Sequence, residues 1–129
     1  MIILDSNILI ALFNPEDTQH AKAKKFMEKI QGTVVLPEIL ISEICTVLSQ
    51  RLTKKAADQF IDIVKSNENI EILFLKSNFE NVLTFYQDTK KEGLSFIDIY
   101  LLQLSKNFIV HTFDKKLDKA IKLYEKETH

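Results

Sequence analysis

The sequence predicts an α/β fold in which helices cover both faces of a parallel sheet. Short apolar segments that fit strands alternate along the chain with longer segments whose apolar residues recur at helical spacing. This alternation is typical of parallel sheets whose strands are joined by right-handed helical crossovers. The 129 residues and the 46% apolar composition suit a single domain over residues 1–129 with one core. We therefore expect a three-layer α/β/α sandwich whose parallel sheet has four or five strands.

The N-terminal segment is expected to form one strand and two helices. Residues 2–4 are a short apolar run that fits a buried strand. Asn7 is placed to cap a helix over residues 8–13. Between residues 18 and 32, apolar residues alternate with lysines at helical spacing, which indicates an amphipathic helix that stops at a glycine.

The middle of the chain is expected to contain two strands separated by a helical hairpin. Residues 33–36 fit the second strand, and a proline opens the helix predicted over residues 37–50. Thr53 is expected to cap the next helix, whose apolar residues lie on one face. Residues 70–75 fit the third strand.

The last third of the chain is expected to form three helices and a strand. One helix lies around residues 79–86, and a second is predicted from Ser95 to about Lys106. Residues 108–113 fit the fourth strand. The segment from residue 114 to about residue 124 is predicted to be a helix, with a short fifth strand near its end as the alternative.

Four acidic residues stand in or beside apolar segments. Asp5 ends MIILD, Glu43 interrupts EILISEICTVL, Asp98 interrupts LSFIDIYLLQL, and Asp114 ends FIVHTFD. An ionised carboxylate that borders a core is unfavourable unless something pairs with it. Four such positions in a small domain therefore suggest a cation site.

The predicted topology can bring these acids together. If the strand order is 3-2-1-4, the first and fourth strands are neighbours, and Asp5 and Asp114 leave the sheet at the same edge. Glu43 lies about two turns into the helix after the second strand, and Asp98 lies one turn into the helix before the fourth. Both can point at that edge. Carboxylate ligands suit Mg²⁺ or Mn²⁺, whose natural chemistry at such a site is phosphodiester hydrolysis.

Each acid also has a local structural alternative, because acidic residues often cap helices and form turns. The alternatives are a capping box of Ser95 with Asp98, a helix cap by Asp114, a turn of Asp5 with Ser6 and Asn7, and a salt bridge from Glu43 to a lysine.

Bulk properties exclude several classes of protein. The net charge of −1 and the pI near 6.3 do not fit a protein that holds nucleic acid mainly through its overall charge. The longest apolar run near the N-terminus covers only residues 8–13, which is too short to span a membrane, and no secretory signal precedes it. We expect a cytoplasmic protein without a membrane partner. Cys45 is alone and lies in an apolar stretch, which favours a small buried side chain over a reactive thiol.

In order and spacing, the segments MIILDSNILIALF, SEI at residues 42–44, LSFIDIYLL and TFDKKL resemble the PIN-domain family over nearly the whole chain. The chain is most similar to the small single-domain branch that includes the VapC toxins of toxin–antitoxin pairs. The resemblance implies a metal-dependent ribonuclease in which the four acids surround one or two Mg²⁺ or Mn²⁺ ions. It also implies a homodimer and an antitoxin partner.

The resemblance gives roles to three polar residues as well. Asn7 would orient Asp5 or a water molecule, Thr112 would hydrogen-bond to a neighbouring acid, and Ser6 would support them. In the implied reaction, water attacks the phosphorus in line and the 3′ oxygen leaves, so that the products carry a 5′-phosphate and a 3′-hydroxyl.

Lysines of the last predicted helix, among them Lys115 and Lys116, can contact the RNA backbone, although lysines on a solvated helix face look the same in sequence. Two other functions stay open. One is a haloacid-dehalogenase-type phosphatase, whose motif Asp5-Ser6-Asn7 resembles only faintly. The other is a non-catalytic PIN module that binds RNA or protein.

Overall fold

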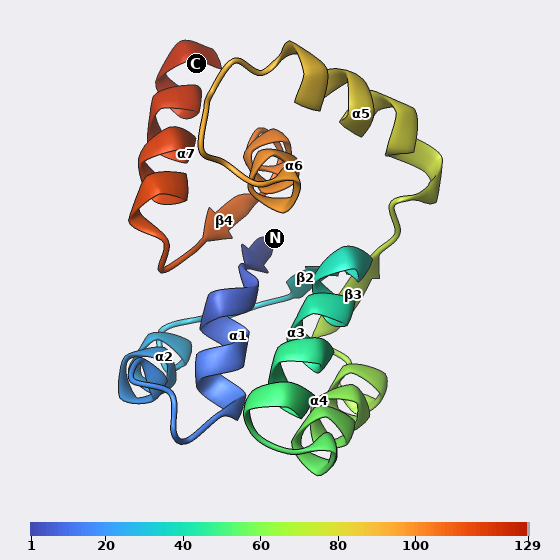
Figure 1. Cartoon of the computed structure of the whole chain (residues 1–129), viewed down its shortest axis with the longest axis vertical. Helices are drawn as coiled ribbons and strands as arrows, with labels where there is room; N and C mark the ends of the chain where they lie inside the picture. Colours follow the sequence, from blue (N-terminus) through green and yellow to red (C-terminus); the bar gives the residue numbers. More distant parts are fainter. Residues whose placement is uncertain (129) are drawn as a thin grey trace.

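The computed structural model of the chain describes residues 1–128, and His129 lies outside the described residues. Over these residues the chain forms four short strands, seven α-helices and one 3-10 turn (Figure 1). Strands and helices alternate, as the sequence predicts. In chain order the elements are β1 (Ile2–Leu4), α1 (Ser6–Phe13), α2 (His20–Met27), β2 (Val34–Pro37), α3 (Glu38–Arg51), α4 (Lys54–Ser66), β3 (Ile70–Leu73), the 3-10 turn (Lys76–Asn78), α5 (Phe79–Asp88), α6 (Phe96–Leu104), β4 (Ile109–His111) and α7 (Lys115–Thr128).

The four strands form one parallel sheet in the order β3-β2-β1-β4, which is the order that the predicted convergence of Asp5 and Asp114 requires. β1 pairs with β4 in a register that places Leu4 opposite His111. The strand order reverses between β1 and β4, and parallel α/β folds bind ligands at the carboxyl ends of the strands that flank such a point. The chain within residues 1–128 forms no fifth strand, because α7 continues as a helix to Thr128.

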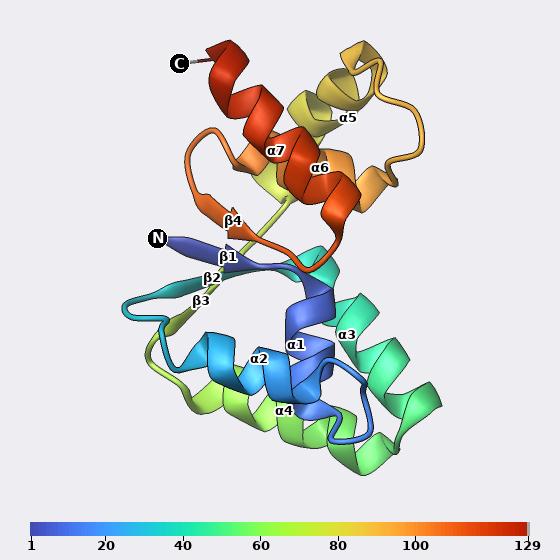
Figure 2. The ribbon, with the colours of Figure 1, turned by 90° about the vertical axis from the view of Figure 1, so that its left-hand side faces the viewer.

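The helices form a layer on each face of the sheet. Figure 2 shows α1 to α4 on one face and α5, α6 and α7 on the other. The chain first moves outward from β1 to β3 through two pairs of helices on one face. It then returns to the other side of β1 through α5 and α6. The predicted three-layer α/β/α sandwich is confirmed.

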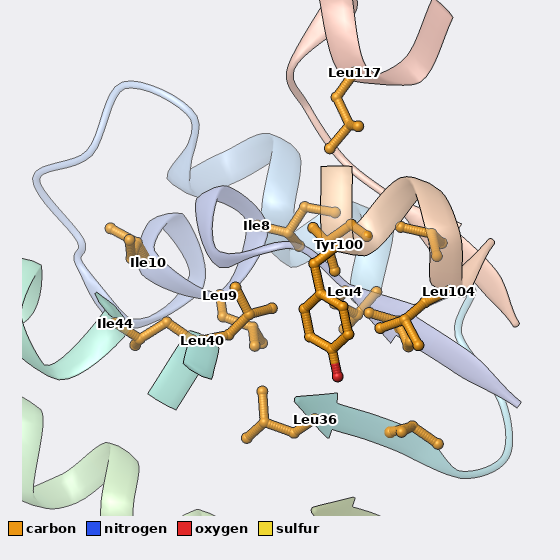
Figure 3. Packing of buried hydrophobic residues seen from close by; sticks show 14 of the residues in the cluster. Leu4, Ile8, Leu9, Ile10, Leu36, Leu40, Ile44, Tyr100, Leu104 and Leu117 are labelled. Carbon is orange, nitrogen blue, oxygen red and sulfur yellow. The ribbon is translucent and has the colours of Figure 1, made fainter. Parts of the chain in front are cut away.

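The core holds the ends of β1 and α3 in place beside each other. Leu4 is 1% exposed, and Leu40 and Ile44, one turn apart on α3, are fully buried (Figure 3). Leu101 and Leu117 fill the other face of the sheet from α6 and α7. A buried leucine or isoleucine contributes about 2 kcal/mol, so these contacts fix the backbones that carry the acidic residues.

The start of α1 differs from the prediction. Asp5, not Asn7, is the N-cap residue: its Oδ1 atom accepts a hydrogen bond of 2.7 Å from the backbone N–H of Ser6. Three consecutive good capping residues precede the apolar run, so spacing alone did not identify which one caps the helix. The side chain of Asn7 is thereby left for contacts outside the helix.

α2 is shorter than predicted and covers only His20–Met27. The residues before it form turns in which Asn14 Oδ1 accepts from Glu16 N at 3.0 Å and Asp17 Oδ1 accepts from Gln19 N at 2.8 Å. Such side-chain bonds to the backbone compete with a helix and delay its start. The helix also ends before the glycine at position 32, whose φ of +91° belongs to a turn.

The cap of α4 and the end of β3 can also be compared with the prediction. Thr53 caps α4 as predicted, with its Oγ1 atom accepting from Ala56 N at 3.0 Å. Beyond β3, Leu75 N donates a hydrogen bond of 2.7 Å to Glu38 Oε1 at the start of α3, which ends the strand earlier than predicted. Within residues 1–128, every helix is too short or too polar to cross a membrane.

Candidate active site

Asp5 lies at the point where the sheet order reverses. Its backbone N–H donates a 2.9 Å hydrogen bond to the carbonyl of His111, so the last bond of the β1–β4 ladder holds this residue in place. The residue is 5% exposed. Its carboxylate therefore leaves the end of β1 at the edge between the two central strands.

Ser6 connects Asp5 to Glu43. The hydroxyl of Ser6 donates to Glu43 Oε1 at 3.0 Å and lies 3.4 Å from Asp5 Oδ1. The other carboxylate oxygen of Glu43, Oε2, is buried and has no hydrogen-bond partner within residues 1–128. Over the same residues Glu43 forms no ion pair with a lysine or with Arg51. Glu43 is thus held by one oxygen and has the second free for a ligand.

Thr112 and Asn7 hold the other side of the Asp5 carboxylate. The hydroxyl of Thr112 donates to Asp5 Oδ2 at 2.7 Å, and Asn7 Nδ2 donates to Thr112 Oγ1 at 3.0 Å. Asn7 Nδ2 also lies 3.4 Å from Asp5 Oδ2, and Asn7 Oδ1 accepts from the N–H of Phe113 at 3.1 Å. These bonds tie α1 to the residues that follow β4.

Asp98 is part of a capping box at the start of α6. Ser95 Oγ accepts from Asp98 N, and Asp98 Oδ2 accepts from Ser95 N, both at 3.0 Å. This local role was predicted as an alternative to ligand binding. Asp98 is half-buried and lies close enough to Asp5 to affect its pKa. The capping box therefore orients Asp98 without removing it from the site.

The electrostatics of the site are dominated by Asp5. Burial raises the pKa of the Asp5 carboxyl above its usual range, because burial disfavours the ionised form. The hydrogen bonds from Thr112 and Ser6 lower the pKa, while repulsion by Asp98 and Glu43 raises it further. Asp98 and Glu43 thus both lie close enough to Asp5 at this edge to act on its charge.

Asp114 differs from the other three acids. It is exposed and caps α7: its Oδ1 atom accepts from Lys116 N at 2.9 Å and from Leu117 N at 3.3 Å. It connects to the site through its backbone, whose N–H donates to Thr112 Oγ1 at 3.0 Å. Across residues 1–128, no three His, Cys, Asp or Glu side chains are grouped closely enough to hold a metal ion as they stand.

Comparison with known proteins identifies the family. A model of the PIN domain matches residues 2–123. The chain belongs to the PIN-domain family. Among solved structures, this PIN domain is similar to the sarcin–ricin-loop-cleaving toxin VapC20 of Mycobacterium tuberculosis, with a TM-score of 0.80 and 19% sequence identity over 93% of this chain and 95% of that chain. No curated protein sequence matches it significantly.

The lysines proposed to contact RNA lie at the start of α7. Lys115 lines a shallow hollow of about 350 Å³ on the outer face of α7 together with Lys119 and Lys122. The ammonium group of Lys116 instead lies against Gly93 in the loop before α6. The PIN domain thus presents the two neighbouring lysines to different surfaces.

Sequence reasoning missed a hollow that adjoins the acids. It has a volume of about 350 Å³ and lies between α1, the turn before α2, and α3. Arg51, the only arginine in the sequence, lies two turns beyond Glu43 on α3 and lines its far end. The spacing of these two residues on one helix face was a usable signal. The lining residues are Ser6, Asn7, Ile10, Asp17, Thr18, Gln19, Glu43, Val47 and Arg51.

Proposed function

We propose that this PIN domain is a metal-dependent endoribonuclease that hydrolyses RNA phosphodiester bonds. The observation that carries the proposal is the bonded group formed by Asp5, Ser6, Glu43 and Thr112 at the reversal of the sheet order. Side chains from three separate segments hold two carboxylates in fixed orientations there. Such an arrangement costs stability in the free protein and is useful when the carboxylates bind a cation.

The residues present fit a divalent cation. Glu43 Oε2 is a buried oxygen without a partner, and the raised pKa of Asp5 reflects its burial near two other carboxylates. Asp5, Glu43 and Asp98 would hold the ion, and Asp114 is the fourth candidate ligand. Oxygen ligands of this kind suit Mg²⁺ or Mn²⁺. When bound, the cation supplies Lewis acidity toward the phosphoryl group and lowers the pKa of water.

The surrounding residues orient the carboxylates. Thr112 donates to Asp5 Oδ2 and Ser6 donates to Glu43 Oε1, so each carboxylate is fixed through one of its oxygens. Asn7 supports Thr112 from α1. Both hydroxyls of this group donate to carboxylates, and we assign them the role of orienting those carboxylates. We therefore assign the attack on phosphorus to water, with the 3′ oxygen as the leaving group and a 5′-phosphate as product.

The biological role follows from the likeness to VapC20. That protein is a toxin that cleaves the sarcin–ricin loop. We propose that this PIN domain is likewise the toxin of a toxin–antitoxin pair, acts in the cytoplasm as a homodimer, and is blocked by an antitoxin protein. A likeness at 19% sequence identity does not indicate which RNA is cleaved, because the shape of the RNA-binding groove sets specificity.

The test is a cleavage assay on purified protein with single-stranded RNA. Cleavage is expected with Mg²⁺ or Mn²⁺ and is expected to stop in EDTA. Asp5→Asn and Asp98→Asn should each lose more than about 100-fold in rate, because a lost ligand affects the reaction more than a lost supporting bond. Equal cleavage in EDTA, or full activity of both variants with Mg²⁺, would contradict the proposal.

A further inference from the structure

Phe113 lies between two residues of the candidate site. Thr112 bonds to Asp5, and Asp114 caps α7. The N–H of Phe113 itself donates to Asn7 Oδ1 at 3.1 Å. The backbone of Phe113 is therefore fixed to the same hydrogen-bonded group as the acids, although its side chain takes no part in that group.

The ring of Phe113 is directed toward α2. It meets the ring of Phe26 edge to face, with centroids 6.1 Å apart and an interplanar angle of 83°. Phe26 makes a similar contact with His111, at 5.0 Å and 72°. These contacts hold the ring of Phe113 firmly, and the residue is still only half-buried.

The face of this ring is covered by a lysine. The ammonium nitrogen of Lys22 lies 4.3 Å from the ring centroid of Phe113. Lys22 is exposed and has no carboxylate within ion-pair distance among residues 1–128. A cation over an exposed ring contributes less than a base stacked on it, and a lysine side chain can move aside without breaking another contact.

We propose that Phe113 is a stacking platform for the base of a nucleotide next to the scissile phosphate. Lys22 moves from the ring to a backbone phosphate when the base stacks. Proteins that bind single-stranded nucleic acid combine an aromatic face with a nearby cation in this way. The inference rests on the proposed ribonuclease function.

The net charge of the chain supports a contact of this kind. At −1, the protein does not attract RNA through its overall charge, so affinity has to come from local contacts. A fixed aromatic ring on the residue between Thr112 and Asp114 supplies one. Because every base has an aromatic face, the platform places the strand without selecting its sequence.

A single tryptophan provides a direct test, since the chain contains none. In an Asp5→Asn background, which is expected to bind RNA without cleaving it, Phe113→Trp should lose fluorescence when single-stranded oligo(A) RNA is added. Phe79→Trp is the matched control, because Phe79 is 45% exposed on α5, away from α2 (Figure 1). Its fluorescence should not change.

Affinity measurements form the second test. In the Asp5→Asn background, Phe113→Leu should weaken oligo(A) binding roughly 5- to 150-fold, whereas Phe113→Tyr and Phe79→Leu should not. Lys22→Ala should lower the slope of log affinity against log salt by about 0.7, the value for one phosphate contact on a single strand. Urea unfolding of each variant separates lost binding from lost folding.

The outcomes distinguish the two proposals. If Asp5→Asn protein binds oligo(A) but Phe113→Trp fluorescence and Phe113→Leu affinity are unchanged, the platform is wrong and the ribonuclease proposal stands. If Phe113 governs binding but the parent protein does not cleave RNA with Mg²⁺ or Mn²⁺, the ribonuclease proposal is wrong, and Phe113 is a base-stacking contact of a protein that binds RNA without cleaving it. An absence of oligo(A) binding by every variant contradicts the platform, and the cleavage assay then decides the ribonuclease proposal separately.

Discussion

At the scale of single residues, Asp5 combines three tasks. It ends the ladder between β1 and β4, caps α1 through Oδ1, and accepts from Thr112 through Oδ2. The first two tasks fix its position, and the third sets the direction of its carboxylate. Burial and two nearby acids then make the ionised form costly while no cation is bound.

That cost predicts the stability of an Asp5→Asn variant. The folded pKa of Asp5 is raised above its unfolded value, so the folded state binds its proton more tightly, and stability falls as pH rises through the folded pKa. At neutral pH in EDTA, Asp5→Asn should therefore melt a few degrees higher than the parent, since asparagine still caps α1. Mg²⁺ should stabilise only the parent. A lower melting temperature of the variant in EDTA would contradict this reading.

The hydrogen bond from Thr112 to Asp5 leads to a prediction about the pH dependence of cleavage. Thr112→Val removes the hydrogen bond that lowers the pKa of Asp5 most, so the acid limb of the rate profile should move to higher pH. At neutral pH, a 10- to 100-fold loss is expected. Thr112→Ser keeps the hydroxyl and is the control. An unmoved acid limb in the valine variant would exclude the assigned role.

The sequence predicts the residues of the site better than their contacts. Asp5 and Glu43 can be identified in the sequence because a carboxylate beside an apolar segment is unfavourable unless it binds a partner. The contact between Asn7 and Thr112 is not visible, because it joins positions 105 residues apart and depends on which strands are neighbours. The capping role predicted for Asn7 was wrong for another reason. Asp5 precedes Asn7 and is an equally good cap, so the helix begins two residues earlier.

At the scale of elements, the order of the sheet was predictable and the ends of the helices were not. Right-handed crossovers leave few ways to arrange four parallel strands, and the observed order is the expected one. The start of α2 depends instead on Asn14 and Asp17, whose side chains bond to the backbone ahead of the helix. The spacing of apolar residues does not show where side chains such as these will bond to the backbone in place of a helix.

The capping box of α6 gives a prediction at this scale. Ser95→Ala should lower the free energy of unfolding by about 1 kcal/mol, the usual cost of a lost N-cap. It should also slow cleavage slightly, because the first turn of α6, which carries Asp98, loses the bond from Asp98 N to Ser95 Oγ, while the backbone N–H at position 95 still donates to Asp98 Oδ2. Ser95→Thr preserves both bonds and should behave as the parent in urea unfolding and in the cleavage assay. Equal losses in the threonine variant would show that the cap is not the cause.

At the scale of the whole molecule, charge is distributed rather than concentrated. The net charge of −1 combines 17 basic and 18 acidic residues. The lysine-bearing helices α2 and α7 lie on opposite faces of the sheet (Figure 2). RNA affinity is therefore expected to depend on a few positions, not on the overall field.

Lys115 and Lys116 test this view. Replacing both with alanine should weaken RNA binding at low salt and reduce the salt slope by about 1.4, as for two phosphate contacts on a single strand. Lys54→Ala is the control, because Lys54 pairs with Asp58 on α4. Titrations at several salt concentrations measure both effects. A slope that is the same in the double variant and in the control would exclude these contacts.

The pairing of β1 with β4 also affects the time at which the protein becomes active during its synthesis. Asp5 and Thr112 are 107 residues apart in the chain, yet they share a hydrogen bond. At a translation rate of 5–20 residues per second, roughly 5 to 20 s pass between the synthesis of the two. A ribosome that carries only the earlier elements holds a chain whose first carboxylate is made but not oriented. On the proposed function, the newborn polypeptide is therefore expected not to cleave nearby RNA until its last strand joins the sheet.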